Sequence, residues 1–189
     1  EWSKARKELE RVLEEHKGAL AARRKLVEVH FVLKDLKAAE QLNEEILRTN
    51  PKDALAHLAK GRLLLAIGDV ANALVELNQT KKYEPDLPPL HYWYAQVYLQ
   101  KGNLEQAKQS LSEALQYDPN FWLARSGLAE LQNRTGAPDA ALANVQELLR
   151  RNPRDLQAYL LMSQAYLAKK DLPQAEKILR VFVEQVPQN

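Results

Sequence analysis

Apolar side chains recur along this chain at the spacing of amphipathic helices. Within residues 85–118, Tyr94, Val97 and Tyr98 form an i, i+3, i+4 stripe, the pattern of a helix with one buried face. A break follows, and its Gly102 suits the left-handed backbone position that closes a helix. The pattern predicts a second helix directly after this turn. Its stripe is formed by Leu104, Ala107, Leu111, Ala114 and Leu115.

The same kind of break returns along the chain. The other breaks are Lys34-Asp35, Gly68-Asp69, Gly136-Ala137-Pro138 and Lys170-Asp171. Two of them have lysine where the others have glycine, so we expect the helices before these lysines to end by another route. The sequence contains no alternating β-branched run bounded by turn residues, and it therefore predicts an all-α fold.

Alanine and proline each recur at a fixed spacing of 34 residues. Self-similarity at one period indicates a repeat array, in which each unit packs on its neighbours. The prolines mark the ends of units, because proline can open a helix but cannot continue one. The alanines are Ala5, Ala39, Ala73, Ala107, Ala141 and Ala175, and the prolines are Pro51, Pro85, Pro119, Pro153 and Pro187.

The recurring alanine has a physical explanation. It stands early in the second helix of each pair, opposite a small residue of the first helix, and two helices cross closely only where neither presents a large side chain. A larger residue recurs four positions later and fills the space beyond the crossing. The small residues are Gly61, Ala95, Ala129 and Ser163, and the larger ones are Leu77, Leu111, Val145 and Leu179.

This pattern resembles the tetratricopeptide repeat, in which aromatic, small, alanine and proline positions recur every 34 residues. The unit 85–118 matches at His91, Tyr94-Ala95, Tyr98, Ala107, Leu111 and Pro119, and the unit 153–186 matches at Tyr159, Met162-Ser163, Tyr166, Ala175, Leu179 and Pro187. The first unit departs at Val27, where a small residue is usual, and at Asn43, where a large apolar one is usual. The resemblance implies a right-handed α-solenoid of antiparallel helix pairs.

The repeat register divides the chain into one continuous solenoid domain. Residues 1–16 are expected to form the second helix of a truncated repeat, and five full repeats span 17–50, 51–84, 85–118, 119–152 and 153–186. Residues 187–189 would begin a further repeat. We interpret the chain as a fragment of a longer, bacterial-type array. Leu179, Phe182 and Val183 are then expected to be partly exposed, which favours self-association through uncapped ends.

Composition limits the classes of partner that the chain can have, but it does not choose between compartments. The chain has 27 basic and 25 acidic residues, and this near balance gives no general attraction to nucleic acid or anionic lipid. The chain has no cysteine, which rules out disulfides, thiolate metal sites and thiol catalysis and suits the cytosol and the bacterial periplasm alike. No apolar run approaches the ~20 residues of a membrane helix, so we expect no direct membrane insertion.

No constellation of residues indicates an enzyme. His57 and His91 lie one repeat apart at a position that is usually aromatic in the family, so packing explains them better than metal binding does. The chain has no glycine-rich phosphate loop after a strand and no serine in a nucleophile elbow. We expect no catalytic residue, no cofactor and no metal.

In the family, the first helices of the repeats line a concave groove. Tyr92 and Trp93 fit a binding hot spot there, although Trp93 could instead pack between adjacent first helices. Arg24, Lys25 and Arg62 favour a partner with some acidity. The lysine and asparagine clamp that some members use for a terminal carboxylate is not matched, because Glu28 would repel that group. The predicted groove residues are Arg24, Lys25, Glu28, Phe31, Leu55, Leu58, Arg62, Leu65, Tyr92, Trp93, Gln96, Leu99, Leu123, Glu130 and Asn133.

Two functions follow from this interpretation. The first is a protein-interaction scaffold that binds a partner peptide or segment in the concave groove. The alternative is an accessory region of a larger secretion, exopolysaccharide-export or enzyme assembly, which is an analogy at the level of the fold. Nucleic-acid binding is not favoured, because Glu28 and Glu130 interrupt the basic groove that base-reading arrays need.

Overall fold

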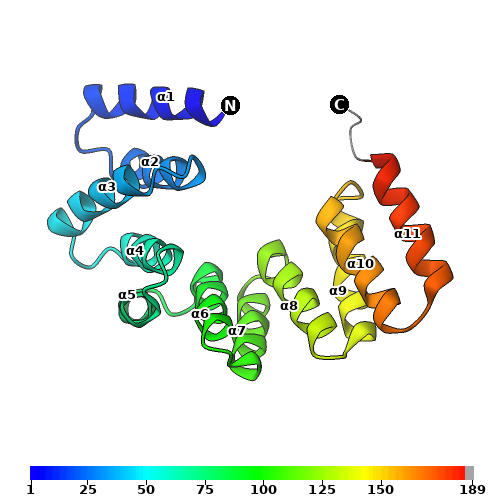
Figure 1. Ribbon diagram of the computed structural model, residues 1–189. Coiled ribbons are helices and arrows are strands. Elements are labelled where there is room, and N and C mark those ends of the chain that lie inside the picture. The colour runs from blue at the N-terminus through cyan, green and yellow to red at the C-terminus, as the bar shows by residue number, and fades with distance from the viewer. Residues whose placement is uncertain (186–189) are drawn as a thin grey trace. The chain divides into compact units, whose positions relative to one another are not determined.

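The computed structural model describes residues 1–185, in which every regular element is an α-helix, so the predicted all-α class is confirmed. Neighbouring helices such as α10 and α11 run antiparallel (Figure 1). The bounds of the helices are α1 (Trp2–Glu15), α2 (Leu20–Val32), α3 (Leu36–Thr49), α4 (Ala54–Ala66), α5 (Val70–Tyr83), α6 (Pro88–Gln100), α7 (Leu104–Tyr117), α8 (Trp122–Arg134), α9 (Pro138–Arg151), α10 (Leu156–Ala168) and α11 (Leu172–Gln185).

The chain consists of two compact units, Glu1–Gln100 (unit 1) and Lys101–Asn189 (unit 2). In unit 1 each of the helices α1 to α6 packs on the next, and the first helices α2, α4 and α6 also contact one another in turn. In unit 2 the helices α7 to α11 pack in the same way, and α8 contacts α10. Each unit therefore stacks helix pairs on one another, as the 34-residue period predicts.

Helix lengths alternate along the array. The first helices α2, α4, α6, α8 and α10 have 13 residues each, and the second helices have 14. Helix α1 also has 14 residues, and its C-cap His16 has backbone angles close to those of Asn50 after α3. Residues 187–189, expected to begin a further repeat, lie outside the described residues.

The turns between paired helices share one backbone geometry. The three glycines of these turns have φ values of 82°, 75° and 75°, and Lys34 and Lys170 take the same left-handed conformation, with φ values of 61° and 62°. After Lys34, the Asp35 N–H donates to the His30 carbonyl over 2.9 Å, which is the bond of a Schellman motif. The expectation that the lysines close their helices differently was wrong, because these backbone hydrogen bonds impose the left-handed position whatever the side chain.

The recurring alanines of the helix pairs are buried, as a tight helix crossing predicts. Ala39, Ala73, Ala107 and Ala141 are completely buried. In the pair α4–α5, a Cβ atom added to Gly61 would lie 3.0 Å from Leu77 Cδ2 and 3.4 Å from the Ala73 carbonyl oxygen. A side chain at Gly61 would therefore crowd Leu77, which shows how closely α4 and α5 approach each other.

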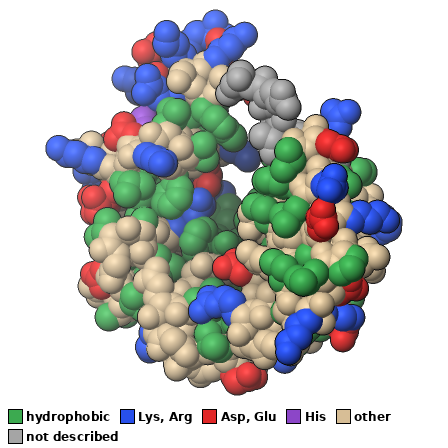
Figure 2. Space-filling view, turned by 45° about the vertical axis from the view of Figure 1, so that its right-hand side comes forward, with side chains coloured by type: hydrophobic (Ala, Val, Ile, Leu, Met, Phe, Trp, Pro, Cys, Tyr) green, Lys and Arg blue, Asp and Glu red, His purple; other side chains and the backbone are tan. Residues whose placement is uncertain are grey.

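The surface mixes apolar and charged side chains. Figure 2 shows patches of hydrophobic side chains interrupted by single basic and acidic ones. Toward the C-terminus, Leu179 and Val183 are exposed and Phe182 is half-buried. Among the residues that the structure describes, no helix is both long and apolar enough to cross a membrane.

Candidate functional site

A hollow of about 480 Å³ opens on unit 1 where α2, α4 and α6 lie side by side. We call it the unit 1 hollow. Seven of the predicted groove residues line it, namely Arg24, Lys25, Glu28, Leu55, Leu58, Arg62 and Trp93. Small and apolar residues complete the lining together with one amide, from Ala21, Val27, Asn43, Ala56, Ala59 and Pro89. The structure therefore brings together residues that lie up to two repeats apart in the sequence.

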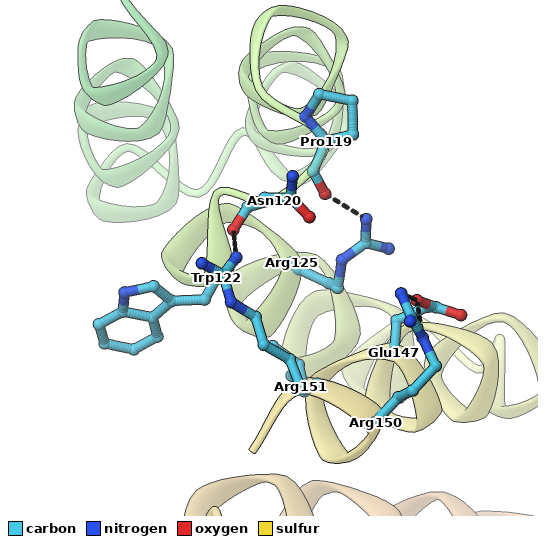
Figure 3. A pocket seen from close by; sticks show the side chains of 8 residues that line it. Pro119, Asn120, Trp122, Arg125, Glu147, Arg150 and Arg151 are labelled. Carbon is cyan, nitrogen blue, oxygen red and sulfur yellow. Dashed lines mark hydrogen bonds and ion pairs between the residues drawn. The ribbon is translucent and has the colours of Figure 1, made fainter.

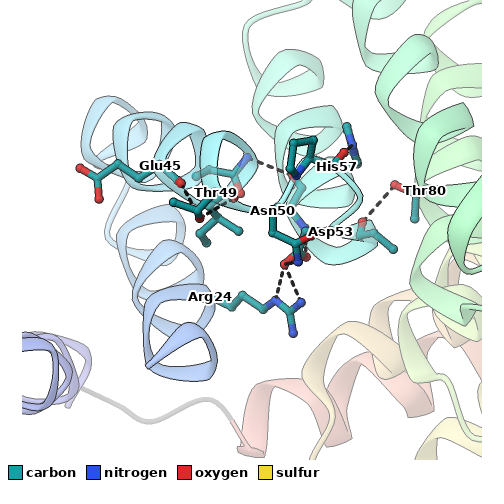
Figure 4. Close-up of polar contacts among 12 residues, drawn as sticks. Arg24, Glu45, Thr49, Asn50, Asp53, His57 and Thr80 are labelled. Carbon is teal, nitrogen blue, oxygen red and sulfur yellow. Dashed lines mark hydrogen bonds and ion pairs between the residues drawn. The ribbon is translucent and has the colours of Figure 1, made fainter. Parts of the chain in front are cut away.

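Arg24 is held at one side of this hollow by a buried carboxylate. Asp53 is the N-cap of α4, and its side chain accepts the Ala56 N–H over 3.0 Å. The same carboxylate accepts hydrogen bonds from Arg24 Nε at 3.2 Å and Nη2 at 2.6 Å, and from Asn50 Nδ2 at 3.3 Å (Figure 4). Because the Asp53 side chain is completely buried, its charge is balanced by Arg24 and the helix N-terminus.

Arg62 occupies the centre of a charged and aromatic cluster. It forms an ion pair with Glu28, which stands one repeat earlier at the same position. Its guanidinium carbon lies 4.5 Å from the centre of the Phe31 ring and 5.1 Å from that of Trp93. Both separations are within the range of cation–π attraction. Through these contacts the cluster connects α2, α4 and α6.

Two of the three basic residues predicted for the groove form ion pairs with acidic side chains. Arg24 is paired with Asp53, and Arg62 is paired with Glu28. Lys25 is exposed, and it has no ion pair among the residues that the structure describes. The unit 1 hollow is therefore mainly apolar with one uncompensated positive charge, and Glu28 faces a guanidinium.

Trp93 packs on neighbouring side chains and also faces the unit 1 hollow. Its ring packs against the buried cluster around Leu58 and Leu90, and it also lines the unit 1 hollow. Tyr92 meets Trp93 edge to face, with ring centres 5.2 Å apart, but it stands outside the residues that line the hollow. Of the predicted aromatic pair, the structure thus places only Trp93 in this hollow.

The remaining predicted groove residues have varied environments. Leu58 and Leu65 are core residues, with only 6% and 5% of their surfaces exposed. Phe31 is half-buried beneath Arg62, and Gln96 and Leu99 are half-buried on α6. In unit 2, Leu123, Glu130 and Asn133 lie on α8, where Asn133 Nδ2 donates to the Leu161 carbonyl over 2.9 Å.

Asn43 lines the unit 1 hollow but is absent from the predicted groove residues. Its side chain is almost fully buried, and its Nδ2 donates to the Ala56 carbonyl over 3.0 Å. The sequence contained the signal, because Asn43 departs from a position that is usually apolar. A buried amide that bonds the first turn of α4 accounts for that departure.

The helix pairs and the hollow on their first helices define an α-helical repeat protein. The tetratricopeptide repeat profile matches residues 1–63, 64–120, 102–143 and 134–189, and the chain belongs to this family. Members of the family generally serve as non-catalytic scaffolds for protein–protein interaction. Among the residues that the structure describes, no three His, Cys, Asp or Glu side chains are grouped so as to hold a metal ion.

Known relatives agree with this assignment. The chain is 32% identical over 137 residues to the TPR repeat-containing protein PA4667 of Pseudomonas aeruginosa, covering 71% of this chain and 23% of that protein. It superposes on the tetratricopeptide protein TTC0263 of Thermus thermophilus with a TM-score of 0.78 and 25% identity, covering 88% of this chain and 91% of that one.

A larger structure matches the whole chain. The structure of the APC/C hetero-tetramer Cut9–Hcn1 matches with a TM-score of 0.89 and 16% identity, over 100% of this chain and 38% of the other, which bears on the fold alone. The predicted tetratricopeptide solenoid class is confirmed by these similarities. The chain spans only about a fifth of the length of the first curated relatives that it matches, since it covers 20 to 23% of each.

Proposed function

We propose that unit 1 binds a segment of a partner protein in the unit 1 hollow, across α2, α4 and α6. The observation that carries this proposal is the composition of the lining, in which the exposed Leu55 and the half-buried Trp93 lie beside the single uncompensated charge of Lys25. An aromatic and aliphatic floor with a few charged groups is typical of sites that anchor a peptide by its apolar side chains.

The partner segment that fits this lining has two apolar anchors and one acidic side chain near Lys25. Arg24 and Arg62 contribute little further attraction for acid, because Asp53 and Glu28 balance them. A strongly acidic segment would meet Glu28 and gain only one new ion pair. The hollow therefore selects for shape and apolar surface more than for charge.

The test compares two exposed apolar positions of unit 1. Leu55 is 37% exposed and lines the hollow, whereas Val75 is 55% exposed on α5. Partners captured by the immobilised chain are identified, and the affinity of the bound segment is then measured for Leu55→Glu, Lys25→Glu and Val75→Glu. We expect both changes in the hollow to weaken binding about tenfold or more and Val75→Glu to leave it unchanged.

Leu55 is a better choice than the buried Leu58, because truncating Leu58 would open a cavity in the core. Circular dichroism of each variant checks that the array stays folded. Loss of binding with Val75→Glu and not with Leu55→Glu would move the site to the second helices and overturn the proposal.

A second candidate function is an accessory role within a larger assembly. It is supported by the small share of the curated relatives' length that the chain covers, because an array that is part of a longer protein can position other domains. The sequence of the full-length gene tests it. A secretion signal, an outer-membrane barrel or a transferase domain on the same chain would favour this function.

A further inference from the structure

A second hollow, of about 290 Å³, lies in unit 2 where the turn before α8 meets the C-terminal end of α9. We call it the arginine hollow, because Arg125, Arg150 and Arg151 line it together with Glu147 and the exposed Trp122. Figure 3 shows the guanidinium groups of Arg125 and Arg151 reaching the turn from two helices, whereas that of Arg150 meets Glu147. Three positive charges and one negative charge leave this small surface with two excess positive charges.

The excess charge belongs to Arg125 and Arg151. Arg150 is matched by Glu147, whose Oε2 accepts from its Nε at 3.0 Å and its Nη2 at 2.9 Å. Arg125 and Arg151 donate only to uncharged oxygens. Within the described part of the chain, neither of them has a carboxylate at ion-pair distance.

Neutral acceptors fix the positions of both guanidinium groups. Arg125 donates from Nη2 to the Pro119 carbonyl over 2.6 Å and from Nη1 to Asn144 Oδ1 over 3.2 Å. Arg151 donates from Nη1 to the Asn120 carbonyl over 2.6 Å. Each of these side chains has further N–H donors, because a guanidinium carries five. The two groups are therefore oriented before any ligand arrives, which lowers the entropy cost of binding an anion.

We propose that the arginine hollow binds a phosphomonoester carried by a side chain of a partner protein. A phosphomonoester has a charge of about −1.5 to −2 near neutral pH, which matches the two excess charges, whereas a single carboxylate would leave one of them unbalanced. Planar guanidinium groups also fit phosphate oxygens with paired hydrogen bonds. The N-terminus of α8 opens beside the same turn and adds a partial positive charge.

Trp122 favours a phosphorylated polypeptide over free phosphate. Its indole is 55% exposed and lies beside Arg151, on the side away from Arg150 and Glu147 (Figure 3). An exposed ring beside an anion site offers apolar surface to the residues that flank a phosphorylated side chain. This site belongs to unit 2, and its proposal does not depend on the unit 1 hollow.

The experiment uses the full chain and a short capped peptide with one phosphoserine among alanine and glycine residues. Isothermal titration calorimetry compares this peptide with its unphosphorylated form, its glutamate analogue and inorganic phosphate. We expect the phosphopeptide to bind most tightly, by about tenfold over the glutamate analogue, and the unphosphorylated peptide not to bind. Equal affinity for inorganic phosphate would overturn the assignment to a protein segment.

Matched charge variants locate the site. Arg151→Gln removes one of the two excess charges, whereas Arg134→Gln removes an exposed arginine at the other end of α8. We expect a loss of about tenfold for Arg151→Gln and a change of less than about twofold for Arg134→Gln. The indole N–H resonance of Trp122 should move when the phosphopeptide binds, and it reports on the same hollow without any mutation. Equal losses for both variants, or an unmoved resonance, would refute the proposal.

Discussion

The Nε2 atom of His57 lies 3.0 Å from the carbonyl oxygen of Pro51, six residues earlier in the chain. The same contact recurs at the same position of each helix pair, 34 residues apart, although the donor changes. It joins Arg23 to Lys17 at 2.6 Å, His91 to Pro85 at 2.8 Å, Arg125 to Pro119 at 2.6 Å and Tyr159 to Pro153 at 3.0 Å. Three kinds of side chain thus tie the first helix of each pair to the turn that precedes it.

The second helix of each pair carries a residue that faces this donor, and its type changes with the type of the donor. His57 Nδ1 lies 2.7 Å from Glu76 Oε2 on α5, so both ring nitrogens of His57 have an oxygen partner. In the fifth repeat, Tyr159 needs one acceptor only, and the residue equivalent to Glu76 is Ile178, which packs on the core. The residue of the first helix and the residue that faces it on the second helix are therefore chemically matched, as histidine with glutamate and as tyrosine with isoleucine.

We predict that the tyrosine and isoleucine pair can replace the histidine and glutamate pair in the second repeat. His57→Tyr alone removes a partner of Glu76, and Glu76→Ile alone removes a partner of His57 and of the solvent-accessible Lys60, so each should lower the free energy of unfolding by about 1–2 kcal/mol. The double variant should lie within about 0.5 kcal/mol of the parent, which is a strongly non-additive result. Urea unfolding followed by circular dichroism measures it. Simple addition of the two losses would show that the positions are independent.

A second prediction concerns the left-handed lysine that closes α2. Lys34 has a φ of 61°, a conformation that costs an L-residue roughly 1 kcal/mol and costs glycine almost nothing. Lys34→Gly should therefore raise the free energy of unfolding by about 0.5–1 kcal/mol, reduced in part by the greater freedom of glycine in the unfolded chain. Lys37→Gly is the control, since Lys37 lies within α3 and glycine there should destabilise by about 1 kcal/mol. The same sign for both variants would contradict this explanation.

The third prediction tests the tight crossing at the recurring alanine. Ala141 is completely buried between α9 and α8, in a cluster with Ala129 and Val145. Leucine at this position should push the helices apart and cost roughly 1–3 kcal/mol. Ala140→Leu is an internal control on the same helix, because Ala140 is exposed and a leucine there should change stability by less than about 0.5 kcal/mol. Thermal unfolding of both variants decides whether burial, and not residue size alone, sets the loss.

The sequence predicted the features that depend on spacing. The alanine and proline periods gave the helix pairs, the crossings and the faces of the first helices, and seven predicted groove residues line one hollow. Spacing did not reveal which charges neutralise each other. Arg24 pairs with Asp53 over 29 residues and Arg62 with Glu28 over 34, and both pairs depend on how neighbouring first helices stack.

The conformational preference of the side chain also failed as a guide where the backbone hydrogen bonds of the helix end were stronger. Lysine rarely adopts positive φ, yet Lys34 and Lys170 do so, because the bonds that end one helix and begin the next leave no other backbone path. Tyr92 and Trp93 looked equivalent in the repeat register. Only the packing of Trp93 beside Arg62 distinguishes them, and that contact joins two separate repeats.

The last prediction is a loss of stability in alkali that depends on Tyr94. Burial, and to a smaller extent the neighbouring Tyr98, raises the pKa of Tyr94 from 10.0 to about 12. The phenol also donates to Asn78 Oδ1 over 2.7 Å, and this hydrogen bond stabilises the protonated, neutral form. The folded state therefore keeps its proton where the unfolded state has lost it, so this contribution is complete below about pH 10 and disappears as the pH rises through about 12.

Tyr94→Phe should remove this part of the pH dependence, because phenylalanine does not ionise. The free energy of unfolding of the parent should fall more steeply between about pH 10 and 12 than that of the variant. Ultraviolet titration of phenolate provides a direct reading, in which the signal of the folded parent that is missing in Tyr94→Phe should have its midpoint near pH 12. An unchanged alkaline slope in Tyr94→Phe would mean that another group controls it, and the burial of this phenol would then carry no energetic consequence.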